Sequence, residues 1–467
     1  MKNRMTERIL WIALVAVLAG TLVFQGFHGS PIRTKAQALP VADPNQYLAL
    51  FQNIYMKIFN EYVDSQKADD LFHNAIDGMI KGLNDPHSAL LRPKSFEELK
   101  TETKGEYGGL GIVVGKKDDK LTVISPMEDT PAEKVGLRAD DRIIKINGTN
   151  VIGIALDKAV DKLRGPPGAP VTITVERDSE KAPFDVTIVR EKIDIKSVKF
   201  STISTNIGYL RVTSFSANTP DQLEKAVASM KTNNCDSLII DLRNNPGGLL
   251  DVAIKVADMF LDSGPIVSTR GRTLNNSPPS YMATPGTIVS PKMPIVVLVN
   301  KGSASASEIF AGAMQDTKRA VLLGTQTYGK GSVQTVINLD GGYGIRLTIA
   351  RYYTPADRMI DKVGLAPDIN VDDKYLTKEQ VDMINKLDRT NILRTFAADH
   401  KDTWSTNDLA KLKENLKSGG IDLPDALLRA KIQYEQTRKT PAYNLELDGQ
   451  LREAVQIMKV RKLLDRN

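Results

Sequence analysis

Short apolar runs alternate with amphipathic segments between residues 196 and 372, and this alternation limits the possible folds more than any other feature. The runs 208–212, 237–241 and 295–299 have the length of strands, and apolar residues recur at helical spacing between them. Thr219–Gln222 predicts a capping box at the start of one such helix. The pattern is typical of an α/β core. The 467 residues allow two or more domains.

The segment 302–334 carries the residues that are best suited to catalysis. Gly302–Glu308 predicts a small-residue turn that becomes a helix, which places Ser305 near unpaired amides and the positive end of a helix dipole. Lys330 lies between two glycines, and Gln334 follows it by four positions. One interpretation is nucleophilic catalysis by the serine. The other is a tight helix entry beside a surface lysine in a glycine turn.

A catalytic serine needs a base, and histidine is the usual one. The four histidines of the chain (His28, His73, His87 and His400) all lie outside this segment and outside the predicted α/β core. A Ser-Lys pair is the economical alternative. It requires burial of the lysine, so that some of its amine is neutral near neutral pH.

The run Gly302–Glu308, together with Tyr328–Gly331 and Gln334, resembles the carboxy-terminal processing (tail-specific) serine proteases. Lys330 follows Ser305 by 25 positions, as in that family. The resemblance extends over about residues 45–372. It implies that Ser305 is the nucleophile, that Lys330 is the general base, and that Gln334 orients the lysine. It also implies a crotonase/Clp-like α/β core.

A second segment with candidate catalytic groups is the turn Asn245–Gly248, which follows a short apolar strand. Glycines between a strand and a helix allow backbone amides to face a ligand oxygen. In acyl transfer such amides stabilise the oxyanion, by roughly 3 kcal/mol per donor. We expect Gly247, with Gly248 as a second candidate, and the amide of Ala306 to be the donors. A purely structural turn is the alternative.

Residues 100–195 predict one small domain of strands with an amphipathic helix at 156–163. This order of elements resembles a bacterial PDZ domain with the peptide-binding strand first. The resemblance implies a loop for a peptide carboxylate at Gly109, Leu110, Gly111 and Ile112, with the helix as the other wall of the groove. No cofactor and no metal site are expected.

Arg164 ends the predicted helix, directly before a rigid turn of prolines and glycines. A charged residue at the end of a peptide groove is suited to report ligand occupancy to the neighbouring domain. The alternative is a cation that simply stabilises a helix C-terminus.

The N-terminus carries basic residues before an almost wholly apolar run at 9–24. This pattern indicates a secretory signal or a single membrane anchor, and the distance of Ala36–Ala38 from the run favours a retained anchor. We therefore expect an extracytoplasmic protein that is attached to the cell membrane, or secreted if the segment is cleaved.

The expected organisation has six parts: an anchor at 1–29, a linker at 30–44, a helical region at 45–99, the PDZ domain at 100–195, the protease core at 196–372 and a helical region at 373–467. Apolar stripes in both helical regions suggest a homodimer. The net charge of +6 is mild, and no basic run carries interleaved aromatics, so nucleic-acid binding is not expected. The single cysteine, Cys235, excludes an intrachain disulfide.

The sequence thus predicts an exported serine endopeptidase of the carboxy-terminal processing type. Its partners would be proteins or peptides with accessible C-termini, and a regulatory protein. The main alternative is a PDZ scaffold on an idle protease core. Acyl-CoA chemistry on a crotonase-like core is a third option, which the Gly247–Gly248 turn alone would permit.

Overall fold

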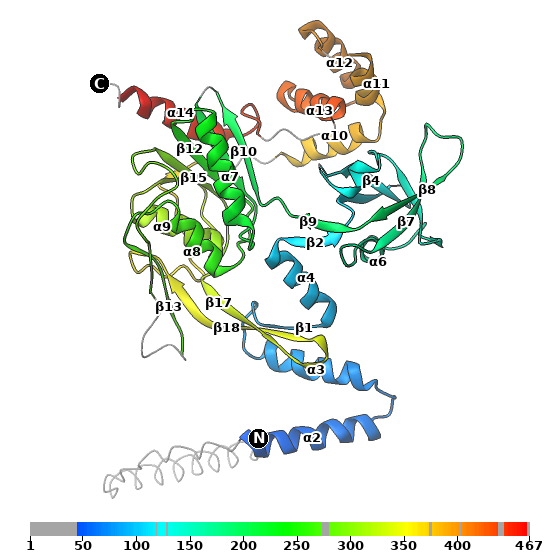
Figure 1. Cartoon of the computed structure of the whole chain (residues 1–467), viewed down its shortest axis with the longest axis vertical. Coiled ribbons are helices and arrows are strands. Elements are labelled where there is room, and N and C mark those ends of the chain that lie inside the picture. The colour runs from blue at the N-terminus through cyan, green and yellow to red at the C-terminus, as the bar shows by residue number, and fades with distance from the viewer. Residues whose placement is uncertain are drawn as a thin grey trace, which may run out of the picture. The chain divides into compact units, whose positions relative to one another are not determined.

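The computed structural model describes residues 44–117, 119–127, 129–204, 206–272, 280–372, 376–400, 403–437 and 443–464 (Figure 1). The chain divides into two compact units between Met79 and Ile80, and each is described by itself. The predicted anchor at 1–29 lies outside the described residues. Within the residues that are described, none of the helices has the length and apolar character needed to cross a membrane.

The first unit contains α2 (Pro44–Glu61) and most of α3 (Ala68–Lys81). None of the residues of α2 is buried. Its exposed apolar side chains include Leu48, Phe51 and Ile54. Homodimerisation through this arm stays a prediction.

The second unit contains a six-stranded sheet in the order β10-β11-β12-β15-β16-β19. The strands are β10 (Val198–Ile203), β11 (Ile207–Val212), β12 (Ser237–Asp241), β15 (Ile295–Val299), β16 (Val321–Gly324) and β19 (Ile369–Asn370). All neighbouring pairs are parallel except β10 and β11. Every residue of β12 and β15 is buried, as expected for central strands covered on both faces.

Alternate residues of these strands lie on opposite faces of the sheet and belong to two different hydrophobic clusters. Leu238, Ile240 and Val297 face α7 (Thr219–Thr232), α8 (Leu250–Asp258) and α9 (Ala306–Asp316). Ile239, Val296 and Leu298 face α14 (Gly449–Leu464) on the opposite side. Burial of each such side chain contributes about 2 kcal/mol. The sheet is therefore sandwiched between helices, which confirms the predicted α/β core.

The expected capping box at the start of α7 is wrong. Asn218 is the residue that precedes the helix, and Thr219 already lies inside it. The Thr219 hydroxyl accepts the amide hydrogen of Ser216 at 2.9 Å. Gln222 accepts the amide of Ser197 at 2.8 Å, which ties the helix to the start of β10 instead.

The helix α14 belongs to the α/β core, although it lies more than 200 residues after β12 in the sequence. Arg243, just beyond β12, contacts Asp241 and Asp448 at 2.6 Å each, and its Nη1 also donates to Gln450 at 3.1 Å. Asp241 is fully buried and Arg243 nearly so. This ion-pair cluster attaches the segment before α14 to the carboxyl end of β12.

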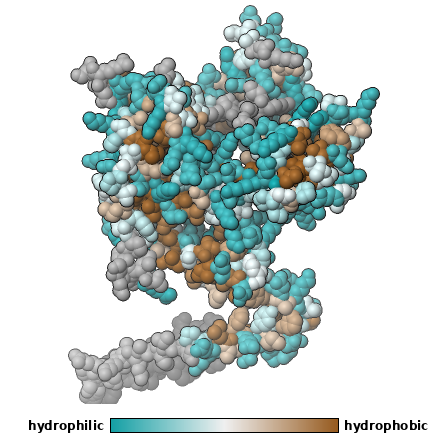
Figure 2. Space-filling model, viewed as in Figure 1, coloured by the Kyte–Doolittle hydropathy of each residue, from teal (hydrophilic) through white to brown (hydrophobic). Residues whose placement is uncertain are grey.

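A second sheet lies beside the core and is built on the long strand β18 (Gly344–Tyr353). One edge of β18 pairs with β17 (Ser332–Asn338) in a hairpin. Its other edge pairs with β1 (Ala89–Leu91) and with β13 (Pro265–Arg270), which in turn pairs with β14 (Ser280–Met282). Figure 2 shows apolar surface over the hairpin, whose exposed residues include Val336, Ile337 and Leu339.

The small domain predicted to resemble a PDZ domain has its own hydrophobic core. Its sheet contains β3 (Ile112–Lys117), β4 (Lys120–Pro126), β5 (Arg142–Ile146), β6 (Thr149–Asn150), β7 (Pro170–Glu176) and β8 (Phe184–Val189), with α5 (Pro131–Lys134) and α6 (Leu156–Leu163). The chain enters and leaves this domain through the paired strands β2 (Glu106–Gly109) and β9 (Glu191–Asp194) (Figure 1). Before β2, α4 (Pro93–Lys104) connects the domain with β1.

Four further helices follow the core: α10 (Lys378–Asp388), α11 (Ile392–Asp399), α12 (Thr406–Ser418) and α13 (Asp425–Thr437). They share a separate hydrophobic cluster of leucines and isoleucines. The predicted boundaries of the six parts stay predictions. Among the described residues after 372, α10–α13 share one hydrophobic cluster and α14 packs in another.

Candidate active site

Ser305 lies on the turn between β15 and α9. Its backbone has φ 58° and ψ −116°, a strained conformation for a residue with a side chain. Two neighbouring hydroxyls hold the turn: Ser303 donates to the carbonyl of Leu242 at 2.8 Å, and Ser307 donates to the carbonyl of Asn245 at 2.9 Å. The turn therefore presents Ser305 at the N-terminus of α9, where unpaired amides favour negative charge.

Lys330 lies on the loop between β16 and β17. A Cβ atom at Gly331 would lie 2.2 Å from the amide nitrogen of Asp361, so this close backbone approach requires glycine. Among the described residues, the half-buried Lys330 amine makes no hydrogen bond and no ion pair. Burial and the positive charge of Arg346 lower the pKa of Lys330, against the opposing effect of Glu308 and Asp85.

Glu308 joins the serine turn to the lysine loop. Its fully buried carboxylate accepts the amides of Ser305 at 2.9 Å, Gly329 at 2.8 Å and Lys330 at 2.9 Å, and the hydroxyl of Thr327 at 2.6 Å. Burial raises the pKa of Glu308 despite these hydrogen bonds. Glu308 was not among the predicted site residues. One signal in the sequence could have indicated its role: a carboxylate in the first turn of a helix that was predicted to be buried.

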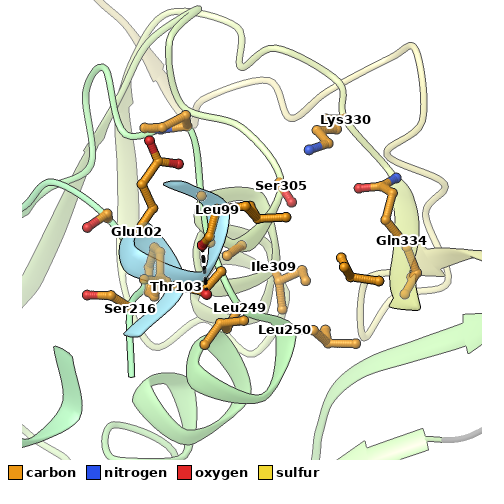
Figure 3. A pocket seen from close by; sticks show the side chains of 18 of the residues that line it. Leu99, Glu102, Thr103, Ser216, Leu249, Leu250, Ser305, Ile309, Lys330 and Gln334 are labelled. Carbon is orange, nitrogen blue, oxygen red and sulfur yellow. Dashed lines mark hydrogen bonds between the residues drawn. The ribbon is translucent and has the colours of Figure 1, made fainter. Parts of the chain in front are cut away.

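Gln334 lies on β17, directly opposite Thr348 of β18. Its Nε2 donates to the Ser332 hydroxyl at 2.8 Å and to the Thr348 hydroxyl at 3.3 Å. Figure 3 shows the amide oxygen of Gln334 on the side of Ser305 and Lys330, with the amide nitrogen turned away. All three predicted catalytic side chains thus line one pocket.

The turn Asn245–Gly248 packs against the serine turn, and only glycine fits there. A Cβ atom at Gly247 would lie 2.6 Å from the carbonyl oxygen of Ala304 and 2.8 Å from the amide nitrogen of Ala306. The Gly247 amide, our first candidate oxyanion donor, is occupied because it donates to Asn245 Oδ1 at 2.9 Å. Among the described residues, the amides of Gly248 and Ala306 make no hydrogen bond. These two are the donors available in this conformation.

Tyr352 is a further residue of the site that the sequence analysis missed. Its fully buried hydroxyl donates to the carbonyl of Lys330 and also reaches the Ser305 side chain. Burial and the nearby Glu308 raise the pKa of Tyr352, so the phenol stays protonated. Nothing in the sequence around Tyr352 distinguishes it from other aromatic strand residues.

The pocket has a volume of about 470 Å³, within the range of ligand-binding clefts. Apolar side chains from the helices around Ser305 line its floor, among them Leu249, Leu250 and Ile309. Figure 3 shows α4 crossing the pocket with Leu99, Glu102 and Thr103. A serine, a half-buried amine of lowered pKa and unpaired amides are the groups that acyl transfer requires.

A smaller pocket of about 150 Å³ lies on the PDZ domain and brings together all the residues predicted to bind a peptide there: Gly109, Leu110, Gly111, Ile112 and Arg164. The Arg164 guanidinium lies over the ring of Tyr107 at 4.7 Å. The terminal carbonyls of α6 are instead satisfied by Arg190, which donates to Leu163 at 2.9 Å and to Lys162 at 3.0 Å. Arg164 is the C-cap residue of α6, so both interpretations of its side chain stay predictions.

Comparison with known proteins identifies both domains. Residues 206–371 match peptidase family S41, and residues 98–176 match the PDZ domain. A carboxy-terminal-processing protease of Bartonella bacilliformis is 45% identical over 329 residues, which cover 70% of this chain and 75% of the relative. A Staphylococcus aureus protein named "Probable CtpA-like serine protease" is 35% identical over 365 residues, covering 78% of this chain and 71% of the relative.

Among solved structures, the photosystem II D1 C-terminal processing protease is 31% identical. The similarity covers 69% of this chain and 92% of that chain. The TM-score of 0.41 is too low to indicate a shared overall arrangement.

Proposed function

Because this chain belongs to the carboxy-terminal-processing proteases of peptidase family S41 and carries a PDZ domain, we propose that it cleaves proteins with a Ser305–Lys330 dyad. One observation supports this assignment above the others. The half-buried Lys330 amine has no ionic partner among the described residues, and it shares a pocket with a serine at a helix N-terminus.

In the proposed reaction the neutral Lys330 amine removes the proton from Ser305 Oγ, and Oγ attacks the scissile carbonyl. Gly248 and Ala306 amides stabilise the oxyanion of the tetrahedral intermediate, by roughly 3 kcal/mol each. The Lys330 ammonium then protonates the leaving amine, and an acyl-enzyme ester remains on Ser305. Lys330 next removes a proton from water, the hydroxide attacks the ester carbonyl, and the Lys330 ammonium returns the proton to Ser305 Oγ as the acid product leaves.

Gln334 has a positioning role in this proposal. During the reaction its carbonyl oxygen, which lies on the side of Lys330, would accept one hydrogen of the lysine amine, so that the lone pair of the amine points at Ser305. Gly247 keeps a supporting role, because its amide is bound by Asn245 and its missing side chain lets the two turns meet.

The PDZ domain is proposed to capture a substrate C-terminus or a regulatory peptide at residues 109–112. An added strand would occupy the groove between β3 and α6, with its carboxylate held by the backbone amides of the loop. Arg164 would sense this occupancy, because it lines the groove and contacts the Tyr107 ring.

Export is proposed from the basic and apolar N-terminus, as is attachment to the membrane by the segment 1–29. A homodimer is proposed through the exposed apolar face of α2. A light-scattering mass of one chain at micromolar concentration would exclude the dimer.

The alternative of a PDZ scaffold with an idle core is not favoured. It would leave the half-buried lysine, the strained serine and the unpaired amides without a function, although each of them has a cost in stability. The acyl-CoA alternative likewise gives no role to the PDZ domain.

The test is cleavage of an unfolded protein by the purified full chain, with and without a peptide that ends in apolar residues. We expect wild-type cleavage, stimulation by the peptide, and no cleavage by Ser305→Ala or Lys330→Ala. Ser229→Ala and Lys225→Ala, at exposed positions on α7, are the matched controls. Retained cleavage by Ser305→Ala would overturn the proposed function. Trapping of an ester by acid quench, seen as a mass increase on the Ser305 peptide, tests the acyl-enzyme.

A further inference from the structure

The turn Asn84–Ser88 directly precedes β1 and lies outside the proposed dyad, yet it is bonded into the wall of the active site. Asp85 accepts the Ser88 hydroxyl at 2.6 Å and the amide of His87 at 3.0 Å. Ser88 in turn accepts the amide of Thr348 at 3.0 Å. The turn is thus attached to β18 at the residue that lies opposite Gln334.

The Thr348 hydroxyl connects this turn to Gln334. It accepts Gln334 Nε2 at 3.3 Å, and it lies close enough to the Asp85 carboxylate to lower the pKa of Asp85 by hydrogen bonding. Burial alone would raise the pKa of Asp85, but the hydroxyls of Ser88 and Thr348 and the His87 amide lower it overall. Asp85 is therefore ionised at neutral pH and accepts hydrogen bonds without donating any.

The direction of these hydrogen bonds matters because hydroxyls both donate and accept. With Thr348 free to rotate, its hydroxyl could bond either end of the Gln334 amide, and the amide could flip. An ionised Asp85 takes the Thr348 proton. The hydroxyl is then left as an acceptor, which only the NH₂ end of the amide satisfies.

We propose that Asp85 is a positioning residue that, through Thr348, fixes the Gln334 amide with its carbonyl oxygen toward Lys330. Figure 3 shows the amide in this orientation. A flipped amide would present its NH₂ group to the lone pair that must accept the Ser305 proton, and the base would be blocked. The inference rests on the proposed function, since it gives Lys330 the role of base.

The charged and titratable groups that face Lys330 come from several elements. Variants can therefore separate an effect of the Gln334 orientation from an effect of the Asp85 charge. Arg346 on β18 and Glu308 on α9 face Lys330, as do Asp85 and His87 on the turn. Removal of the Asp85 charge lowers the pKa of Lys330, because Asp85 favours the ammonium form. Removal of the Thr348 hydroxyl leaves Ser332 as the remaining acceptor of the Gln334 amide among the described residues and changes no charge.

The experiment compares Asp85→Asn, Thr348→Val and Thr348→Ser in the full chain, with kcat and KM measured on a peptide substrate across pH. We expect kcat to fall about 10-fold or more in the first two variants, with KM within about 2-fold of wild type. Thr348→Ser, which keeps the hydroxyl, should restore the activity. The acidic limb of the kcat profile should move to lower pH in Asp85→Asn only.

Asp340→Asn at the tip of the same hairpin and Thr335→Val on β17 are the matched controls. Asp340 is exposed, and Thr335 does not line the pocket. Melting temperatures within about 2 °C of wild type exclude a folding defect, and Thr348→Val tests the idea independently if Asp85→Asn is unstable.

The decisive readout is a double-mutant cycle with Gln334→Ala, followed by the rate at which a fluorophosphonate labels Ser305. If Asp85 acts through Gln334, Asp85→Asn and Thr348→Val cause no further loss in that background. Additive losses, or wild-type kcat in Thr348→Val, would overturn the inference. Failure of the proposed function is distinguishable, because Ser305→Ala would then keep its activity whatever Asp85 does.

Discussion

The protease core buries two groups of charges, the Asp241–Arg243–Asp448 cluster and the Glu308–Lys330 region of the candidate active site. In the first, one guanidinium bonds two carboxylates, and the pKa of Asp241 is lowered even though burial would raise it. In the second, the Glu308 carboxylate accepts only neutral donors, and the Lys330 amine has no partner among the described residues.

The two groups show what ion pairing does and what its absence permits. A paired charge is held in its ionised form and contributes to cohesion of the fold. An unpaired buried lysine is costly, but its amine is neutral at a lower pH than usual and can accept a proton. Variants that remove or neutralise a charge in either group therefore test the difference between the paired cluster and the unpaired lysine.

The largest effect is expected at Lys330. Lys330→Met and Lys330→Arg should lower turnover by about 10³-fold or more, because methionine has no basic group and arginine stays protonated. Lys330→Met should also raise the melting temperature at neutral pH by roughly 1–3 °C, since an unpaired buried charge is removed. Lys301→Met, at an exposed position near the serine turn, is the control. Turnover by Lys330→Arg near the wild-type rate would contradict the dyad.

A smaller loss of turnover is expected for Glu308→Gln. The amide can accept hydrogen bonds at only one end, so it cannot satisfy Ser305, Thr327, Gly329 and Lys330 together. A shift of the two turns of about 1 Å should lower kcat about 10²-fold. Glu224→Gln on the exposed face of α7 should leave kcat unchanged. If Glu308→Gln cleaves at the wild-type rate, the carboxylate does not hold the two turns in register.

Breaking the paired cluster should affect stability first. Arg243→Met leaves the buried Asp241 with only Arg211 as an ionic partner, and we expect the free energy of unfolding in urea to fall by about 3 kcal/mol. Lys462→Met breaks a surface pair with Asp236 whose side chains are 40% and 48% exposed. It should cost about 0.5 kcal/mol or less. Equal losses in the two variants would show that burial does not set the strength of these pairs.

The smallest effect is a shift of the pH profile. Activity should rise with pH as Lys330 loses its proton, and the midpoint should lie below the ordinary lysine pKa because burial favours the neutral amine. Glu308 raises the pKa of Lys330, so the residual activity of Glu308→Gln should have its acidic limb at lower pH. A limb that moves to higher pH would mean that another group controls the rate.

The sequence pattern predicted the elements that are fixed by local periodicity. The helix at 156–163 and the strands at 237–241 and 295–299 lie where expected, because their apolar residues repeat at the spacing that the covered faces require. The family resemblance supplied Ser305, Lys330 and Gln334, whose short mutual spacing is visible in the sequence.

Contacts between distant segments could not be predicted in the same way. Asp85 reaches Thr348, and Asp448 reaches Arg243, only after the sheets have formed. Tyr352 has an ordinary strand pattern around it. The capping box at Thr219–Gln222 failed for two reasons. The Thr219 hydroxyl accepts the amide of Ser216, which lies before the helix, and Gln222 accepts the amide of the distant Ser197.

The pairing of β1 with β18 has a consequence for the order of synthesis. The turn at 84–88 leaves the ribosome early, but Thr348 and Tyr352 follow more than 250 residues later, and Asp448 later still. A growing chain therefore carries its serine for some time without a competent base beside it. We expect stalled nascent chains to react with a fluorophosphonate only once residues beyond 353 have emerged. An unfinished chain would thus be unable to cleave any substrate before its core is complete.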